Sequence, residues 1–161
     1  MFKNRGKFRS LQELKIKKKA ERIRDDYYNS SDFELYIDDS QIKGAGLGVY
    51  TDDDIPENMI IDEYRGELIE SFEEKEGVYY YQIVEPNKET GQIGIGIDAV
   101  NLPRCYMAMM NDASFEKNLE NNCDFESDIE NKKVYIVTNR EITAGEELFV
   151  SYGDGYWRIS Q

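Results

Sequence analysis

The chain of 161 residues has no histidine, only two cysteines and three prolines, and no long apolar run. Without histidine there is no imidazole for a catalytic triad, a zinc finger or a general base. No stretch is apolar enough for a membrane span and the start is unlike a cleaved signal, so we expect an intracellular protein. For Cys105 and Cys123, one disulfide and two reduced, partly buried thiols both stay open, and an intracellular location favours the thiols.

Charge is distributed unevenly along the chain. Residues 1–24 hold ten Lys or Arg and two acidic residues, a net charge of +8, whereas the remaining residues have a net charge of −21. We therefore expect an acidic body with a basic N-terminal arm. Such a body repels nucleic acid and attracts basic peptides. An acidic surface that merely keeps the protein soluble explains the composition equally well.

The basic arm has the pattern of a helix. Ser10 and Glu13 have the spacing of a capping box, in which both side chains satisfy free amides at a helix start, so we expect a helix over Leu11–Asp26. Its apolar residues are sparse and its middle is too basic to bury, which places it on the surface or against a partner. A nuclear-import or nucleic-acid role and a simply solvated face are both open.

The rest of the chain lacks amphipathic helices and alternates short apolar runs with turn residues. Candidate strands cover residues 33–37, 48–51, 59–69, 79–84, 94–98, 133–138 and 147–152. We therefore expect a mainly β domain of several small sheets, residues 33–161, preceded by a basic helical segment, residues 1–32.

Two glycine-containing segments are candidates for a binding site. In KGAGLGVY the glycines Gly44, Gly46 and Gly48 let the backbone pass close to a ligand, although a tight β-turn explains them as well. In IDEYRGELI, Tyr64 and Gly66 fall inside an expected strand. Glycine there indicates a bulge or a close approach, and an ordinary half-buried tyrosine is the common alternative.

Two further segments carry polar and aromatic candidates. RCYMAMMNDAS places Asn111 and Asp112 directly after an apolar stretch. A buried asparagine needs partners that a polar ligand supplies, but an Asn-Asp turn can also serve its own backbone. EELFVSYGDGYW ends an expected strand at Tyr152 and then presents Tyr156 and Trp157. Aromatic rings beside glycines indicate a flat or enclosed ligand, whereas a C-terminal strand anchored in the core is the alternative.

In this order, GxGLGV, EYxGE, an asparagine-containing turn followed by NC, and AGEELxxxYGDxxW resemble the motifs of the SET-domain protein lysine methyltransferases. The resemblance covers about residues 35–157, and its last motif is the most specific. It implies the SET fold, whose C-terminal segment passes under a preceding loop in a knot-like arrangement. It also implies methylation of a protein lysine with S-adenosylmethionine as the methyl donor.

The chemistry of that reaction fits the residue types present. A lysine ammonium must lose its proton before it attacks the sulfonium methyl, and a buried aromatic channel disfavours the charged form. Tyrosine hydroxyls can orient the neutral amine. No histidine, metal ion or covalent nucleophile is needed, so no metal site is expected.

The resemblance also implies a role for each matching residue. Tyr152 is expected beside the methyl-transfer axis, and the expected catalytic residues are Tyr152, Tyr64 and Tyr156. The substrate channel is expected to hold Tyr64, Phe125 and Tyr156, and Trp157 is expected to stack on the adenine. The expected cofactor-binding residues are Lys43, Gly44, Ala45, Gly46, Tyr80 (with Tyr79 as its alternative), Asn111, Asp112, Tyr152 and Trp157.

Three positions carry finer expectations. Tyr156 stands where the family has phenylalanine or tyrosine, a position linked with how many methyl groups fit, which predicts mainly monomethyl-lysine. Asn111, Asp112 and Ala113 replace the usual Asn-His-Ser, so Asp112 keeps a hydrogen-bonding group but adds negative charge near a cationic cofactor. No cysteine cluster follows Trp157, so a second subunit, the N-terminal helix or the substrate is expected to close the lysine channel, and we favour a homodimer or the helix.

We therefore expect an active enzyme that methylates a basic, histone-like tail in a chromatin and nuclear setting. No membrane is expected as a partner, and no direct contact of the acidic body with nucleic acid. The alternative is a catalytically degenerate SET module that binds basic peptides, which the Asn-Asp-Ala turn favours. Tyr64, Tyr152 and Trp157 favour the enzyme. A small β interaction domain without methyl transfer requires four motifs to occur in this order by coincidence.

Overall fold

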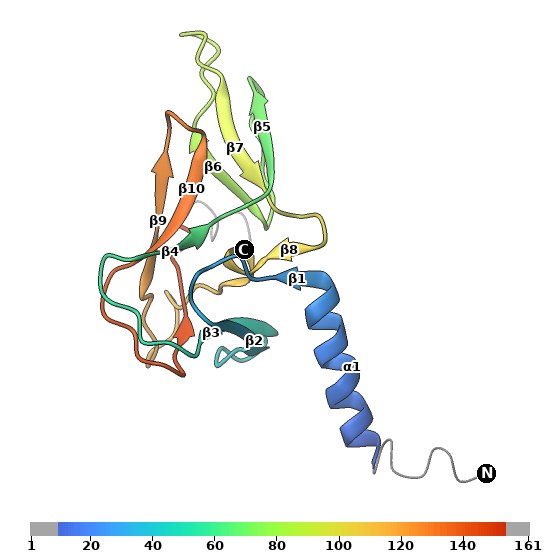
Figure 1. The fold of residues 1–161 in the computed structure, drawn as a ribbon. Helices are drawn as coiled ribbons and strands as arrows, with labels where there is room; N and C mark the ends of the chain where they lie inside the picture. The colour runs from blue at the N-terminus through green and yellow to red at the C-terminus, as the bar shows by residue number, and fades with distance from the viewer. Residues whose placement is uncertain (1–9, 154–161) are drawn as a thin grey trace, which may run out of the picture.

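The computed structural model describes residues 10–153, which form one helix, a series of short strands and a single 3-10 turn (Figure 1). The expected mainly β fold with an N-terminal helix is confirmed. The elements are α1 (Leu11–Asp26), β1 (Tyr27–Tyr28), β2 (Leu35–Asp39), β3 (Leu47–Thr51), β4 (Ile60–Glu63), β5 (Glu67–Ser71), β6 (Tyr80–Val84), β7 (Gly94–Asp98), β8 (Arg104–Cys105), the 3-10 helix η1 (Tyr106–Met109), β9 (Cys123–Asp128), β10 (Lys133–Thr138) and β11 (Glu147–Leu148).

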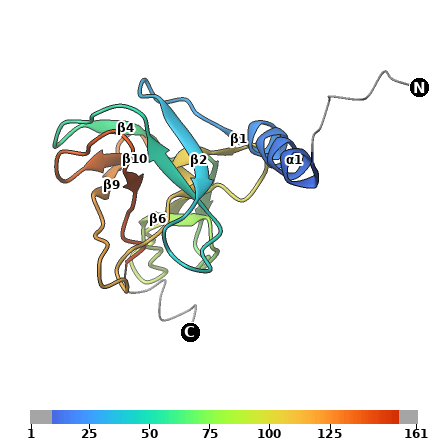
Figure 2. The same cartoon turned by 90° about the horizontal axis from the view of Figure 1, so that it is seen from below.

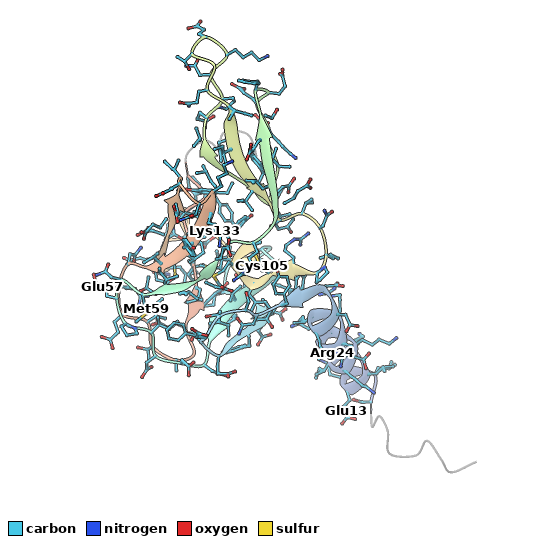
Figure 3. All side chains as sticks on the ribbon, turned by 45° about the horizontal axis from the view of Figure 1, so that its top comes forward. Glu13, Arg24, Glu57, Met59, Cys105 and Lys133 are labelled. Atoms are coloured by element: carbon cyan, nitrogen blue, oxygen red, sulfur yellow. The ribbon has the colours of Figure 1, made fainter. Side chains whose placement is uncertain are left out.

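Helix α1 has the predicted bounds. The Ser10 hydroxyl accepts a hydrogen bond from the Glu13 amide at 3.2 Å, which caps the first turn. None of its residues is buried, as expected from its basic sequence. The helix projects from the body, and Figure 3 shows Glu13 near its outer end and Arg24 nearer the body. Lys19 ties it to the end of β2 through Asp38 and Asp39, at 3.3 and 2.8 Å.

The strands form four small sheets. Three of them have three strands each, in the orders β11-β3-β2, β4-β10-β9 and β5-β7-β6, and all their pairs are antiparallel. The fourth pairs β1 with β8 in parallel and fastens the end of α1 to the body (Figures 1 and 2). Within residues 10–153, no helix is long and apolar enough to cross a membrane.

The predicted strand over residues 59–69 is wrong as a single element, because the chain forms β4 and β5 with a break at residues 64–66. Gly66 explains the break: a Cβ there would collide with the carbonyl oxygen of Asp98 and with the amide of Ala99. The glycine therefore serves a close approach of two backbones, one of the two interpretations of this motif. The break turns Tyr64 inward, where its exposed fraction is 6%.

Two other strand predictions need correction. The predicted strand over 147–152 is a ladder of two residues, β11, followed by single bridges. Strand β9 was not predicted, although it pairs with β10 along its whole length. Its sequence, CDFESD, has four polar residues in six positions, three of them exposed, so alternation of apolar residues is almost absent.

Both cysteines lie in the core. Cys105 and Cys123 are free thiols with exposed fractions of 1% and 0%, which confirms the thiol alternative. Burial raises the pKa of the Cys123 thiol to about 12. The same core contains Val49 from β3, Ile136 from β10 and Ile142 from the segment between β10 and β11.

The segment after β11 lies between two distant parts of the chain. The Val150 amide donates to the Asn111 carbonyl at 3.0 Å, and the Cys123 amide donates to the Phe149 carbonyl at 3.0 Å. The C-terminal motif is therefore held by both the Asn111 turn and the start of β9. These bonds bring the motifs together, while the knot-like threading stays a prediction.

Candidate active site

A cavity of about 1090 Å³ lies where these segments meet, and all four motifs contribute to it. Its lining includes side chains from the glycine-rich loop, the β5–β6 loop, β6, η1, β9 and the C-terminal segment. The lining residues are Tyr27, Ile42, Ala45, Leu47, Tyr64, Glu74, Lys75, Glu76, Gly77, Val78, Tyr79, Tyr80, Tyr81, Gln82, Glu85, Met107, Ala108, Met109, Met110, Asn111, Asp112, Phe125, Val150 and Tyr152.

The glycine-rich loop, residues 42–47, joins β2 to β3 and forms one edge of the cavity. Gly44 and Gly46 have φ of +83° and +77°, a backbone conformation that other residues rarely adopt. Ala45 lines the cavity together with its apolar neighbours at both ends of the loop. Of the predicted cofactor residues in this loop, Ala45 alone is among the described lining residues, whereas Lys43, Gly44 and Gly46 shape its backbone.

The Asn111–Asp112 turn forms what we call the polar wall, together with Tyr152. The side-chain NH₂ of Asn111 donates to the backbone carbonyl of Leu47 at 2.9 Å, which connects the turn to the glycine-rich loop. The Tyr152 hydroxyl donates to the carbonyl of Met110 at 2.6 Å. Asn111, Asp112 and Tyr152, three of the predicted site residues, therefore line one cavity, although they come from segments forty residues apart.

Asp112 stands where the resemblance to SET domains leads us to expect a histidine. Its exposed fraction is 6%, and its Oδ2 accepts from the Tyr152 amide at 2.8 Å. Its Oδ1 accepts from the Ser114 amide at 2.8 Å, from the Ser114 hydroxyl and from the Asn121 side chain at 3.0 Å. The carboxylate thus connects the C-terminal segment to the Asn111 turn by hydrogen bonds. Aspartate in place of histidine therefore keeps a hydrogen-bonded connection at this position.

Three aromatic residues that line the cavity, Tyr64, Tyr81 and Phe125, form what we call the aromatic wall. The Phe125 ring lies 4.3 Å from that of Tyr81 and 5.8 Å from that of Tyr64, centre to centre, and it meets Tyr64 edge-on. Tyr81 was not among the predicted residues. Its signal was present in the run Tyr79 to Tyr81, but only the strand register decides which of three adjacent tyrosines meets Phe125.

The Tyr64 hydroxyl has a defined state as well as a defined position. It donates to the carbonyl of Tyr79 at 2.6 Å. Burial raises the pKa of this phenol far above its usual range, and the neighbouring Cys105 and Tyr152 add to the effect. Tyr64 therefore stays a neutral hydroxyl at working pH, which suits an orienting group and not a general base.

Charged residues also line the cavity, on the segment between β5 and β6. They are Glu74, Lys75 and Glu76, followed by Glu85 after β6. Lys75 is 3.3 Å from a carboxylate oxygen of Asp98 and 5.7 Å from the ring centre of Tyr80. Tyr80, a predicted cofactor residue, lines the cavity beside this charged segment.

Some of the residues and elements named in the predictions are not part of the cavity lining that the structure describes. Tyr156 and Trp157 lie outside the described residues. Helix α1 contributes no lining residue; only Tyr27, directly after it, reaches the cavity. Among residues 10–153, no group of three or more metal-ligating side chains lies together.

A family model described as the SET domain matches residues 46–153, about two thirds of the chain. The chain belongs to the SET-domain family. The match begins inside the glycine-rich loop and ends just after Tyr152, so it contains the polar wall and the aromatic wall. No curated protein matches the chain.

Solved SET-domain structures share its fold. The methyltransferase domain of human PR domain-containing protein 2 is 22% identical, with 77% of this chain and 80% of that chain covered and a TM-score of 0.58. An active polycomb repressive complex 2 in the stimulated state is 25% identical over 76% of this chain, with a TM-score of 0.57. The complex from Chaetomium thermophilum, autoinhibited and bound to S-adenosylmethionine, is 24% identical over 76% of this chain, with a TM-score of 0.53. The SET domain described here spans 15% of the length of each of these two polycomb chains.

Proposed function

We propose that this SET domain transfers a methyl group from S-adenosylmethionine to a lysine side chain of a protein. The observation that carries the proposal is the convergence of the polar wall, the glycine-rich loop and the aromatic wall on one cavity of about 1090 Å³. Ligand pockets usually measure about 300–1000 Å³, so this volume is sufficient for a nucleoside-sized cofactor and a lysine side chain.

The residues present fit the cofactor on the side of the polar wall. Added Cβ atoms at Gly44 and Gly46 would meet nothing within 4 Å, so the loop backbone is open to an incoming ligand. Asn111 and Asp112 offer polar groups to the amino-acid part, Ala45 an apolar contact, and Tyr80 and Trp157 aromatic surface. When bound, S-adenosylmethionine supplies an activated methyl group on a sulfonium sulfur.

The aromatic wall acts on the lysine. Tyr64, Tyr81 and Phe125 exclude water and disfavour an ammonium, which lowers the lysine pKa and favours the neutral amine that reacts. The neutral Tyr64 hydroxyl remains hydrogen-bonded to the backbone carbonyl of Tyr79, and the Tyr64 ring limits the width of the channel. Tyr152 fixes the Met110 carbonyl at the junction of the two walls, where an amine hydrogen can be oriented.

Tyr156 is proposed to limit the product to monomethyl-lysine, since its hydroxyl takes room that a second methyl group needs. We expect Tyr156→Phe to raise the share of di- and trimethyl-lysine, measured by mass spectrometry on a lysine peptide. An unchanged product distribution contradicts this proposal. Phe125→Leu is the matched control for general loosening of the channel.

The substrate is proposed to be a basic, histone-like tail, and the setting chromatin in the nucleus. Support comes from the carboxylates of Glu74, Glu76 and Glu85, which line the cavity and favour a basic segment. We also propose that residues 33–161 form the catalytic domain and that a second copy closes the lysine channel. Light scattering tests the dimer, because a monomer at working concentration rules it out.

The experiment is incubation of the full chain with methyl-tritiated S-adenosylmethionine and a panel of core histones. We expect label on histone lysines and a loss of about a hundredfold or more in Tyr152→Phe, since orienting and electrostatic groups contribute about that much. The variant also loses the hydrogen bond to the Met110 carbonyl, so it should stay folded with a thermal midpoint lowered by only a few degrees. Binding of cofactor and peptide without methyl transfer would identify the alternative, a catalytically degenerate module that binds basic peptides. The natural Asp112, which stands in place of the usual histidine, favours this alternative.

A further inference from the structure

Glu147 is the most deeply buried charged side chain among the described residues, with an exposed fraction of 1%. Its Oε1 accepts from the Ser40 hydroxyl at 2.7 Å. Its Oε2 accepts from the Gln41 amide at 2.9 Å and from the Gln41 side chain at 3.4 Å. Ser40 and Gln41 directly precede the glycine-rich loop, so the carboxylate from β11 holds the entrance of that loop.

The same carboxylate also contacts the exit of the loop. A Cβ at Gly48 would collide with the Glu147 Oε1 and would lie 3.3 Å from the Asn111 amide nitrogen. Glycine at this position therefore leaves the space that the carboxylate occupies. The backbone of Glu147 is itself fixed, because the side-chain NH₂ of Asn122 donates to the Glu147 carbonyl at 2.9 Å.

The donors around Glu147 are neutral, and among the described residues it has no ion-pair partner. A buried carboxylate is expensive in free energy unless several donors satisfy it. Burial raises the pKa of Tyr50 to about 12, and the negative charge of Glu147 adds to that effect. A neutral or apolar residue would fill this space at a lower cost in free energy. We therefore expect the carboxylate to have a specific structural or functional role.

The glycine-rich loop needs such support. Two backbone hydrogen bonds close it, from the Ser40 amide to the Gly46 carbonyl at 2.8 Å and from the Ala45 amide to the Ile42 carbonyl at 3.1 Å. The open space around Gly44 and Gly46 provides no packing that would select one conformation. Contacts of Glu147 at both ends of the loop supply the missing restraint.

We propose that Glu147 is a positioning residue, whose carboxylate fixes residues 42–47 in the conformation that binds the cofactor without touching the cofactor itself. The inference rests on the proposed function, because it presupposes that this loop holds S-adenosylmethionine. It assigns a role to the buried glutamate of the AGEEL motif and links that motif to the glycine-rich loop.

The test is calorimetric titration of the full chain and of Glu147→Gln with S-adenosylmethionine and with S-adenosylhomocysteine. The glutamine turns an NH₂ toward donors, so we expect both dissociation constants to rise about tenfold or more, the change expected from losing a charge-assisted hydrogen bond. The KM for S-adenosylmethionine should rise likewise, with kcat at saturation nearly unchanged. A loss confined to the cationic cofactor indicates a charge effect and overturns positioning.

The matched control is Glu146→Gln. Glu146 belongs to the same turn but pairs with Arg140 at 2.9 Å, away from the loop, so its variant should bind the cofactor like the wild type. Ser40→Ala removes a single donor and should weaken binding less. Combined with Glu147→Gln, its effect should be less than additive, because both changes break the same hydrogen bond.

Hydrogen exchange without cofactor separates this inference from the proposed function. In Glu147→Gln, and in Ser40→Ala if the first variant does not fold, the amides of residues 41–48 should exchange faster while β10 stays protected. Exchange that rises equally across the domain, or not at all, overturns the inference. If the wild type binds no S-adenosylmethionine, the proposed function fails, and faster exchange of this loop alone still supports the restraint by Glu147.

Discussion

The two walls of the cavity are built by different interactions. The polar wall consists of Asn111, Asp112 and Tyr152, held by hydrogen bonds of 2.6–3.0 Å to backbone and side-chain atoms. The aromatic wall consists of Tyr64, Tyr81 and Phe125, held mainly by ring contacts with centroids 4.3–6.5 Å apart.

This difference determines what each wall tolerates. Hydrogen bonds to buried groups fail when one partner is removed, because the remaining donor is left unsatisfied. Ring packing is less directional and accepts another apolar side chain of similar volume. We therefore expect the polar wall to depend on the identity of its residues and the aromatic wall to depend on their volume.

The largest effect is expected at Asp112. Asp112→Ala leaves the Tyr152 amide and the Asn121 side chain without this acceptor, which should lower the free energy of unfolding by about 3 kcal/mol. Urea unfolding measures this change. Asp112→Asn retains one carbonyl oxygen and should lose less than half as much. Equal losses in both variants would show that one carbonyl oxygen cannot replace any part of what the carboxylate contributes, which would contradict this expectation.

An intermediate effect is expected at Phe125, which is half-buried. Phe125→Ala should lower the free energy of unfolding by about 2 kcal/mol, below the 3–5 kcal/mol typical of a fully buried phenylalanine. Phe125→Leu keeps most of the volume and should lose about 1 kcal/mol or less. A leucine variant as unstable as the alanine variant would contradict the tolerance expected of the aromatic wall.

The smallest effect is expected for Tyr64→Phe, which removes one hydrogen bond to Tyr79 and should lower the free energy of unfolding by about 1 kcal/mol at pH 9. The folded-state pKa of Tyr64 is raised above the ordinary 10.0, so its contribution is fully present below pH 10 and declines as pH rises above that value. The phenylalanine variant lacks this decline. The two proteins should therefore converge in stability by about pH 11, where one pH unit corresponds to about 1.4 kcal/mol. A constant difference contradicts a buried neutral phenol.

Local signals predicted much of the fold. The cap at Ser10 gave the bounds of α1, and alternation within the sequence gave β7 and β10. Gly66 indicated a bulge or a close approach, but the division into β4 and β5 could not be predicted, since it depends on the backbone of Asp98, thirty-two residues beyond Gly66. Strand β9 was missed for a similar reason: its support comes from pairing with β10 and not from its own pattern.

In the candidate site, the sequence indicated only those residues that belong to recognisable motifs. Motif order indicated Tyr64, Asn111 and Tyr152, and all three line the cavity. Motifs do not tell which of two adjacent glutamates is buried, so Glu147 was missed; the register of β11 against β3 decides that it points inward while Glu146 pairs with Arg140.

The central claim is that the polar wall binds S-adenosylmethionine, and calorimetric titration of the cofactor into the full chain tests it most directly. We predict binding at one site, weakened about tenfold or more in Asn111→Ala and nearly unchanged in Tyr64→Phe, since only the first substitution removes a hydrogen bond to the glycine-rich loop. Thermal midpoints of both variants control for unfolding. No binding by the wild type, or equal binding by the folded Asn111→Ala variant, would contradict the account.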